Sequence, residues 1–295
     1  MVKRLLRNTL LHLGIFYHVK YSKLLDLYRY LVIPDYMRFN RVQELFFRGI
    51  VDGARLMPSQ GKKIIFDIGA NIGDKAEIFR RVADQVVCVE PDTRNVDILN
   101  IRFRHRSNVT VLSRAVDSQS GIKEFFVNDV DSAYNTLSEK WRDVLQHDNR
   151  FDADIHFQEQ YLVETTTLDH LIEQFGMPVF IKLDIEGYEI NALRGLTQPV
   201  PYVSFEANLP EFRTETIQCL ERLAELSPEV YFAFSVQEGL QGELSDRYDL
   251  DSMRSVVRTT SVRFMEILAS LHAGMETNRN NRRQELANAF HGEPR

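Results

Sequence analysis

The first residues that could do chemistry lie in "IIFDIGANIG", Ile64 to Gly73, where an apolar run around an acid leads into a turn bounded by glycines. A strand that runs into a small-residue loop and then a helix commonly binds a nucleotide, because backbone amides at the helix N-terminus can approach the ligand. A P-loop would end in Gly-Lys-Ser/Thr, but Asp74 follows Gly73, which excludes ATP or GTP hydrolysis of that type. The dinucleotide pattern G-x-G-x-x-G is replaced by D-x-G-x-x-x-G.

Two acids indicate which nucleotide the loop would hold. Asp67, inside the first predicted strand, would repel a pyrophosphate and suits a ligand that carries positive charge, such as an ammonium or a sulfonium. Glu90 ends the second predicted strand, 21 residues after Gly69, where an acid binds the two hydroxyls of a ribose. An adenosine-type ligand with a cationic arm is S-adenosylmethionine, which is the cofactor we predict. The alternative is a structural strand-turn-helix with a buried acid.

A second group of acids follows two later strands. "IKLDIEGYE" places Asp184 at the carboxyl end of a predicted strand and Glu186 just beyond it, and Glu206 ends the next strand in "YVSFEAN". Because ligands of open parallel sheets bind at the carboxyl ends of strands, we expect these carboxylates to converge there and to act as general bases on a hydroxyl. Lys182 completes this catalytic set, either as a pairing cation on the strand or as a substrate contact. Glu186 and Glu189 could instead cap the following helix.

Metal binding is a weaker interpretation of the same acids. Two or three carboxylates could bind Mg²⁺, but no Asp-Asp or Asp-Asn pair follows the fourth predicted strand, so a metal is not favoured. The stretch "HDNRFDADIH", His147 to His156, lacks regular spacing and is interpreted as a solvated loop. Cys88 and Cys219 lie far apart in apolar stretches, which predicts reduced, buried thiols rather than a zinc site.

Alternating strands and helices must position these residues. Residues 1–60 have mainly helical spacing, and short apolar runs separated by helical patterns follow. The expected strands are Ile64–Ile68, Gln85–Glu90, Asn108–Val116, Phe180–Asp184, Tyr202–Ala207, Val230–Val236 and Val262–Ala269. Continuous apolar strands between helices imply a mostly parallel sheet covered on both faces. The irregular insertion Asp117–Thr167, with an extra strand at Gly121–Asp129, is expected to contact substrate.

Four segments resemble the successive motifs of FkbM-type S-adenosylmethionine-dependent methyltransferases: "FDIGANIGD", "VEPDTRNVDIL", "TTTLDHL" and "IKLDIEGYEINALRGL". The resemblance covers about Ile64 to Ala207, and its K-x-D-x-E-G-x-E element is the most specific part. It implies an α/β, Rossmann-like, seven-stranded class I methyltransferase sheet and O-methylation of a sugar hydroxyl in a glycan, glycolipid or secondary metabolite. The expected domains are a helical N-terminal extension or cap at residues 1–60, the methyltransferase domain at 61–271 and a polar tail at 272–295.

The resemblance also assigns the site residue by residue. The implied cofactor contacts are Asp67, Gly69, Ala70, Asn71 and Gly73 for the methionine arm, Glu90 for the ribose, Pro91, Asp92, Ala115 and Val116 for the adenine side, and Asp184 toward the methyl group. "YNTL", Tyr134 to Leu137, resembles the family's N-S-S-L element, which implies that Asn135 and Thr136 hydrogen-bond a substrate hydroxyl. A non-catalytic partner subunit and a nicotinamide-dependent oxidoreductase are the alternatives. The intact D-x-G-x-x-x-G pattern disfavours the first, and Asp67 disfavours the second.

The charge distribution limits the partners. The formal net charge of -6 argues against a nucleic-acid partner and leaves a small molecule, glycan or glycolipid as the expected acceptor. Residues 1–50 nevertheless carry nine basic and three acidic side chains, interleaved with aromatic residues that could contact anionic lipid. A leucine stripe at residues 24–31 favours a cap packed on the sheet instead. No run of 18 to 20 apolar residues and no signal-peptide cleavage pattern occurs, so we predict a cytoplasmic protein, with peripheral contact to the inner face of the membrane as the alternative.

Overall fold

The computed structural model describes residue 19 and residues 34–54, 61–128, 132–147, 156–157, 159–236 and 244–271. Three predictions therefore lie largely or wholly outside the described residues. They are the membrane or cap role of the first 33 residues, the loop at 148–155 and the polar tail at 272–295. Among the helices that the structure describes, none combines the length and hydropathy needed to cross a bilayer.

The central sheet has seven strands in the order β3-β2-β1-β7-β8-β10-β9. Their bounds are β1 (Ile64–Ile68), β2 (Gln85–Val89), β3 (Val109–Leu112), β7 (Phe180–Leu183), β8 (Tyr202–Asn208), β9 (Tyr231–Ser235) and β10 (Phe264–Ser270). Strand β10 lies between β8 and β9 and is antiparallel to both, whereas the other pairs are parallel. This arrangement confirms the predicted Rossmann-like α/β sheet. The order of the strands reverses between β1 and β7, which are parallel neighbours.

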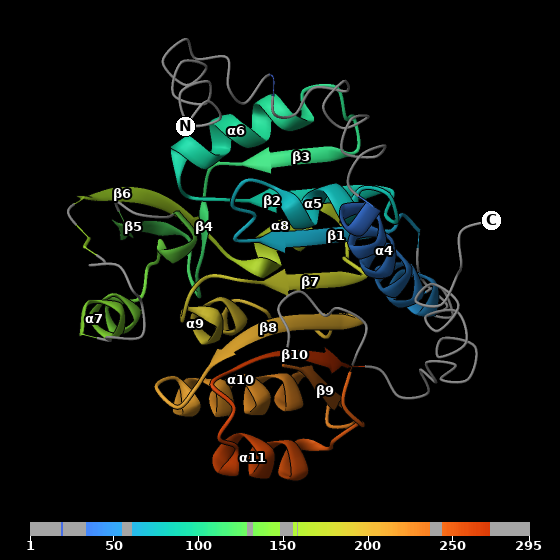
Figure 1. Cartoon of the computed structure of the whole chain (residues 1–295), viewed down its shortest axis with the longest axis vertical. Coiled ribbons are helices and arrows are strands. Elements are labelled where there is room, and N and C mark those ends of the chain that lie inside the picture. Colours follow the sequence, from blue (N-terminus) through green and yellow to red (C-terminus); the bar gives the residue numbers. More distant parts are fainter. Residues whose placement is uncertain are drawn as a thin grey trace.

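The insertion forms a second, smaller sheet beside the first. Its strands are β4 (Ala115–Val116), β5 (Gly121–Val127) and β6 (Glu159–Thr166), in the order β4-β6-β5. The prediction of one continuous strand from Asn108 to Val116 was wrong, because β3 ends at Leu112 and β4 pairs with β6 in the second sheet. A short 3-10 helix, η1 (Ser132–Tyr134), and helix α7 (Glu139–His147) follow β5. Figure 1 shows β5, β6 and α7 beside the carboxyl ends of the central strands.

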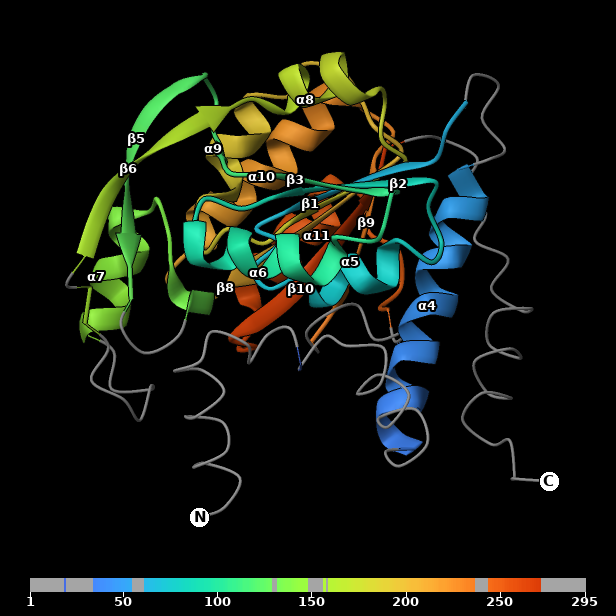
Figure 2. The same ribbon diagram turned by 90° about the horizontal axis from the view of Figure 1, so that it is seen from above.

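Helices cover both faces of the central sheet (Figure 2). One face carries α4 (Pro34–Ala54), α5 (Asp74–Phe79) and α6 (Thr93–Phe103), and the other carries α8 (Leu168–Phe175), α9 (Glu189–Arg194), α10 (Arg213–Leu226) and α11 (Leu250–Thr259). The alternation of side chains along each strand supplies apolar residues to both layers. On the first face, Phe47 of α4 packs edge-on against Phe79, with ring centroids 4.8 Å apart. Helix α4, which falls in the region predicted to be helical, therefore packs directly on the sheet domain.

The glycine loop after β1 connects the two halves of the sheet. The amide of Gly69 donates a hydrogen bond to the carbonyl of Val89 at the end of β2 (2.9 Å), and the amide of Asp184 donates to the carbonyl of Ile68 (3.0 Å). Gly69 has φ +77°, and a Cβ at this position would lie 1.7 Å from the carbonyl oxygen of Asp184. Any side chain at this position would push β1 and β7 apart at the end where the predicted site residues gather.

Gly69→Ala should therefore destabilise the fold. The substitution combines a positive φ with a backbone clash, so we expect the free energy of unfolding to fall by more than about 1 kcal/mol. Urea titration would measure the change. Gly61→Ala is the matched control, because nothing lies within 4 Å of a Cβ there, and it should change the value by less than about 0.5 kcal/mol. Equal effects of the two substitutions would contradict this view of the loop.

Candidate functional site

A pocket, named here the strand-end pocket, lies at the carboxyl ends of β1, β2 and β7 and is bounded by the insertion. Ten of the predicted site residues line it: Gly69, Asn71, Glu90, Pro91, Ala115, Val116, Asn135, Thr136, Asp184 and Glu186. The other predicted residues lie behind or beside the lining: Asp67, Ala70, Gly73, Asp92, Lys182 and Glu206. The sequence therefore placed most of the candidate residues around one pocket, although their roles remain predictions.

Glu90 lines this pocket, and backbone amides hold its side chain. Its carboxylate accepts hydrogen bonds from the amides of Asn71 (2.8 Å) and Asp92 (2.9 Å). Its side chain is buried, and burial raises the pKa of Glu90 to about 7. Hydroxyl groups that donate to the carboxylate would favour its charged form, because they replace water that burial has removed. The geometry suits the predicted contact with a ribose.

Asp92 has a structural environment instead. It is fully buried and caps α6 by accepting a hydrogen bond from the amide of Arg94 (2.9 Å). Its carboxylate also accepts a hydrogen bond from the side-chain amide of Asn135 (2.8 Å). Asp92 thus ties the insertion to the start of α6, and it shapes the pocket from behind its wall.

Asn135 and Thr136 fix the insertion on the central sheet. The Asn135 side-chain oxygen accepts from the amide of Asn128 (2.7 Å), in addition to the bond to Asp92. The hydroxyl of Thr136 donates to the carbonyl of Glu186 (2.8 Å) and accepts from the amide of Ser138 (2.8 Å). These side chains therefore have protein partners, and their predicted contact with a substrate hydroxyl remains a prediction.

Sequence reasoning missed several residues of the pocket lining, among them Phe125, Ser132 and Tyr188. Phe125 lies on the extra strand that the sequence did predict, and its position on alternate residues with Val127 could have indicated a face turned inward. Tyr188 stands between the two acids of "EGYE" and could have been noticed as a polar aromatic residue at the same turn. Ser132 carries no comparable signal.

A row of charged side chains crosses the sheet beside the pocket. Asp67 on β1 lies opposite Lys182 on β7, and the Lys182 ammonium lies 2.5 Å from an oxygen of Asp184. Asp67 is fully buried, and burial raises its pKa to about 6, although the charge of Lys182 opposes the shift. Burial alone would lower the pKa of Lys182, but the surrounding carboxylates, with Asp184 first, raise it. Lys182 is therefore a charged ammonium that several carboxylates share.

Three half-buried carboxylates converge beside Lys182, as predicted. Asp184, Glu186 and Glu206 each offer an oxygen within 4.8 Å of the others. Burial and the charges of Asp184 and Glu186 raise the pKa of Glu206 well above its ordinary value. Glu266 of β10 lies directly opposite Glu206 in the sheet and adds to this effect. Such a group can accept a proton, and its three oxygens could also hold a divalent cation.

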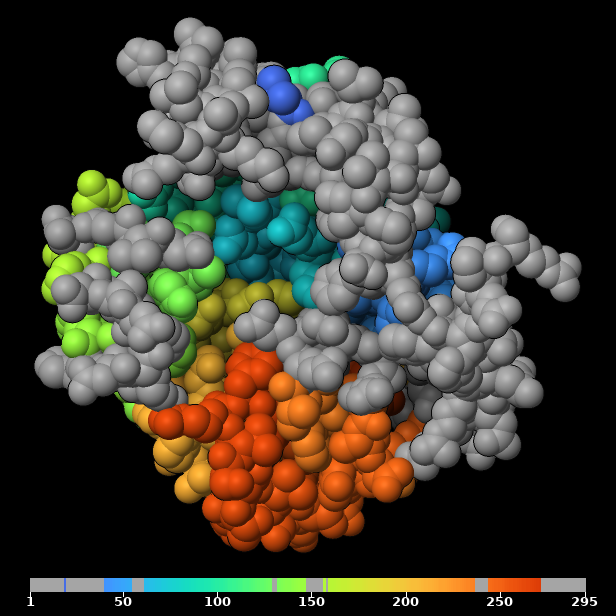
Figure 3. Space-filling view, viewed as in Figure 1, coloured from blue at the N-terminus to red at the C-terminus, as the bar shows by residue number. Residues whose placement is uncertain are grey.

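The face that carries α4 and α5 exposes part of this region. Figure 3 shows residues of the β7 region (olive) at the surface between the β1–α5 region (blue-green) and the C-terminal strands (orange). Asp184, Glu186 and Glu206 are each half-buried, whereas Lys182 is 4% exposed. Water and small molecules can therefore reach the carboxylates but not the ammonium beneath them.

The remaining singled-out residues have structural positions. The carboxylate of Glu189, at the start of α9, accepts hydrogen bonds from the amides of Ile185 (3.3 Å) and Gly187 (3.2 Å). These amides belong to the turn before α9, and no side chain caps the helix at its N-cap residue Tyr188, so the helix-capping interpretation of Glu189 was wrong; its carboxylate holds the turn after β7. Cys88 and Cys219 are free and buried, as predicted, and burial raises the pKa of both thiols.

Comparison with known proteins finds one matching family profile and several solved structures that align with the chain. A sequence profile described as "Methyltransferase FkbM domain" matches residues 67–227. No protein of curated function matches the chain significantly. Among solved structures, an rRNA methylase from Streptococcus thermophilus aligns at 8% identity and a TM-score of 0.39, over 77% of this chain and 94% of its own. The precorrin-6y C5,15-methyltransferase of Geobacter metallireducens aligns at 11% identity and a TM-score of 0.35, over 75% and 85%. The plantazolicin methyltransferase BpumL, solved in complex with a triazolic desmethylPZN analog and SAH, aligns at 9% identity and a TM-score of 0.36, over 85% of this chain and 90% of its own.

Glu189→Gln should change the pH dependence of stability. Burial raises the pKa of Glu189 from 4.5 to about 7. The folded protein therefore binds a proton more tightly than the unfolded chain, and the stability that this proton contributes below pH 4.5 is lost as the pH rises through 7. The Gln side chain has no proton to lose, so the stability of the variant does not fall in this way. Its free energy of unfolding relative to the wild type should therefore increase between pH 5 and pH 8, by on the order of 1 to 3 kcal/mol. Urea titrations at both pH values would measure it.

The exposed Glu229, before β9, supplies the control. Glu229→Gln should give the same difference from the wild type at both pH values, because this side chain is exposed to solvent. A difference between Glu189→Gln and the wild type that does not change with pH would show that Glu189 is ionised in the folded protein without penalty.

Proposed function

This chain belongs to the FkbM methyltransferase family and is an S-adenosylmethionine-dependent methyltransferase, and we propose that it methylates a hydroxyl group of a sugar in a glycan, glycolipid or secondary metabolite. One observation carries the proposal: the carboxylates of Asp184, Glu186 and Glu206 lie within 4.8 Å of one another beside the strand-end pocket. A hydroxyl is a poor nucleophile until its proton is removed, and grouped carboxylates supply that removal. The net charge of -6 further disfavours a nucleic-acid acceptor.

The strand-end pocket fits the methyl donor in its chemistry. Glu90 would bind the ribose hydroxyls, Gly69 and Asn71 the methionine arm, and Ala115 and Val116 would form an apolar wall for the adenine. The donor supplies a methyl group on a positively charged sulfur atom, and the sulfur leaves as a neutral thioether. A cation is suited to this place because the adjoining carboxylates outnumber the adjoining ammonium groups.

Donor binding also requires some movement of the walls. The strand-end pocket contains about 80 Å³ of accessible space, which is below the roughly 300 to 1,000 Å³ of typical small-molecule sites. Ser132, Ala133 and Leu137 belong to the segment of the insertion that lines it. We propose that the side chains of this segment shift when the donor enters, while the hydrogen bonds of Asn135 and Thr136 keep its backbone in place.

The carboxylates divide the work on the acceptor. Asp184 and Glu186 line the pocket, whereas Glu206 lies just behind them. We assign to Asp184 the contact with the acceptor hydroxyl. The Lys182 ammonium donates a hydrogen bond to one oxygen of this carboxylate and so holds it in one orientation. We assign to Glu206 the acceptance of the proton, because its raised pKa makes it the stronger base of the group. Alignment by these fixed groups supplies a large part of the catalysis.

A bound Mg²⁺ is the alternative use of the same three carboxylates. Oxygen ligands from three acids are the type that Mg²⁺ prefers, and the ion would lower the pKa of a bound hydroxyl in place of a base. Activity that a chelator removes and Mg²⁺ restores would assign the carboxylates to the metal. Activity that is indifferent to chelator assigns them to proton transfer.

Glu90→Ala should weaken donor binding. The loss of hydrogen bonds from two hydroxyls to a charged group is worth about 2 kcal/mol, or about a thirty-fold increase in the dissociation constant. Calorimetric titration with S-adenosylmethionine would measure it. Glu90→Gln should keep the loop folded, since the amide oxygen can still accept a hydrogen bond from Asn71, and should weaken binding less. Asp97→Ala, at an exposed position of α6, is the control. If it raises the dissociation constant as much as Glu90→Ala does, the assignment of Glu90 to the ribose is contradicted.

Asp184→Asn and Glu206→Gln should separate alignment from proton acceptance. Asp184→Asn should lower kcat by about 10², because the acceptor hydroxyl loses its alignment, with little change in donor affinity. The wild-type rate should fall as the pH drops below the raised pKa of Glu206, because protonated Glu206 cannot accept a proton. In Glu206→Gln most of the methylation rate should be lost, and the remaining rate should no longer fall at acidic pH (the acidic limb of the pH profile). A Glu206→Gln enzyme that keeps both the rate and the acidic limb would place the base elsewhere, and Glu229→Gln is the unaffected control.

A further inference from the structure

The turn after β7, residues 184–188, carries two of the three grouped carboxylates, Asp184 and Glu186. Its backbone is strained, because Glu186 has φ +54°, a left-handed conformation that residues other than glycine rarely adopt. Such a conformation costs free energy and persists only where the surrounding structure holds it in place. The contacts that hold this turn therefore decide where its carboxylates point.

Two anchors of the turn act directly on its backbone. The hydroxyl of Thr136 donates a hydrogen bond to the carbonyl of Glu186 (2.8 Å). The carboxylate of Glu189 accepts hydrogen bonds from the amides of Ile185 (3.3 Å) and Gly187 (3.2 Å). Both anchors act on residues 185–187, so the position of the end of the turn, residue 188, depends on other contacts.

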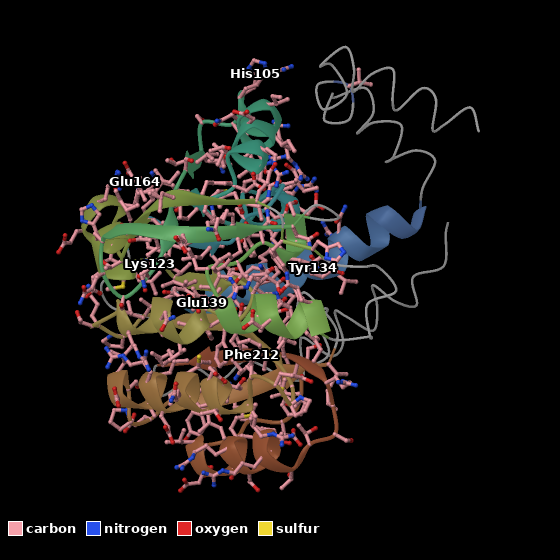
Figure 4. The ribbon with its side chains drawn as sticks, turned by 90° about the vertical axis from the view of Figure 1, so that its left-hand side faces the viewer. His105, Lys123, Tyr134, Glu139, Glu164 and Phe212 are labelled. Atoms are coloured by element: carbon pink, nitrogen blue, oxygen red, sulfur yellow. The ribbon has the colours of Figure 1, made fainter. Side chains whose placement is uncertain are left out.

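A third anchor lies at Tyr188 and reaches across to the second sheet. The Lys123 ammonium of β5 donates a hydrogen bond to the Tyr188 hydroxyl (2.8 Å) and forms an ion pair with one oxygen of Asp117 (2.8 Å). The Tyr188 hydroxyl in turn donates a hydrogen bond to the other oxygen of Asp117 (3.3 Å). These three side chains form a closed triangle, named here the β5 anchor. Figure 4 labels Lys123 on the side of the molecule where β5, β6 and α7 lie.

The β5 anchor differs from an ordinary surface ion pair in its burial. The side chain of Asp117 is buried and that of Tyr188 nearly so, whereas that of Lys123 is about half exposed. The backbone of Asp117 is itself fixed, because its amide donates a hydrogen bond to the carbonyl of Thr166 in β6 (2.9 Å). A buried carboxylate that the second sheet fixes in this way offers a stationary partner for the Tyr188 hydroxyl.

The β5 anchor connects the two sides of the strand-end pocket. Ala115 and Val116, directly before Asp117, line the side assigned to the adenine, whereas Glu186 and Tyr188 line the side of the carboxylates. The position of the turn relative to a bound donor is therefore set partly through the β5 anchor. A displacement of about 1 Å is enough to disturb such an alignment strongly.

We infer that Lys123 and Asp117 are positioning residues, which act through the Tyr188 hydroxyl to hold the turn so that its carboxylates face the sulfonium of the donor. The inference rests on the proposed function in one respect, the placement of the donor's methyl group beside Asp184 and Glu186. It goes beyond that function by giving a role in the discrimination between the cationic donor and its neutral product to two residues that do not line the strand-end pocket.

The test compares the binding of S-adenosylmethionine and S-adenosylhomocysteine to the full chain by calorimetric titration. The product lacks the positive charge, so the ratio of the two dissociation constants, donor over product, reports how well the carboxylates face the sulfonium. The variants are Tyr188→Phe, Lys123→Met and the double variant. Glu186→Gln removes one carboxylate directly and calibrates the readout. Glu124→Gln, at the exposed next position of β5, and Tyr231→Phe, at an exposed position of β9, are the matched controls.

Tyr188→Phe and Lys123→Met should each raise this ratio by about three-fold or more, while the affinity for S-adenosylhomocysteine and both controls stay within two-fold. Tyr188→Phe leaves every charge in place, so its effect reports position. The loss of the Lys123 charge alone would favour the cation and lower the ratio. The double variant should match Tyr188→Phe, because Lys123 acts through the Tyr188 hydroxyl.

The inference alone is overturned if Glu186→Gln raises the ratio and the two variants of the β5 anchor do not, or if they weaken the binding of both ligands equally, as a loosened fold would. Additive effects in the double variant would contradict the route through Tyr188. An unchanged ratio in Glu186→Gln as well would overturn the placement of the methyl group on which the inference rests.

Discussion

The site depends on one buried ammonium group, that of Lys182. It lies within the field of four carboxylates from four strands: Asp67 of β1, Asp184 at the end of β7, Glu206 of β8 and Glu266 of β10. Carboxylates so close together would repel one another and take up protons if no cation stood among them. Removing one partner of a buried ion pair typically costs about 3 to 5 kcal/mol, because the remaining charge is left uncompensated. Lys182 therefore offsets part of the repulsion among these acids, although burial and the neighbouring carboxylates still raise the pKa of Asp67 and Glu206.

The insertion is the second element on which function depends. Asn135 joins it to Asp92, and Thr136 joins it to Glu186, so its position is set from both sides of the strand-end pocket. Tyr188, whose hydroxyl accepts a hydrogen bond from Lys123 (2.8 Å), adds a third connection from the turn after β7 to β5. The insertion thus borders the strand-end pocket and also the hollow between β5, α7, α9 and α10.

The central strands and the acids at their ends could be predicted from sequence, because each depends on a local pattern. An apolar run that stops at Glu90 or Asp184 indicates both the strand and the end that faces the ligand. The contribution of Glu266 could not be predicted in this way, because β10 comes late in the chain and reaches Glu206 only through antiparallel pairing in the sheet. The break between β3 and β4 was missed for a similar reason, since β4 turns away to pair with β6, about 50 residues later.

Side-chain partners were the least predictable part of the site. Asp92 follows Glu90 closely and reads as a second ligand contact, but its geometry at the start of α6 gives it a backbone amide to cap. Asn135 and Thr136 carry polar groups that suit a substrate, and the fold gives those groups protein partners. In both cases the sequence shows which atoms can hydrogen-bond, whereas the tertiary contacts decide with which partner.

The most direct test of this account is the number of protons released when the cationic donor binds. Calorimetric titrations at pH 7, in two buffers of different ionisation enthalpy, would compare S-adenosylmethionine with S-adenosylhomocysteine, which lacks the charge on sulfur. In the proposed site Glu90 contacts the ribose of both ligands, so its contribution should cancel in the difference. If the sulfonium lies against the carboxylates around Lys182, it lowers the raised pKa of Glu206, and S-adenosylmethionine should release more protons than its product. Equal proton release by the two ligands would contradict the placement of the methyl group beside this cluster.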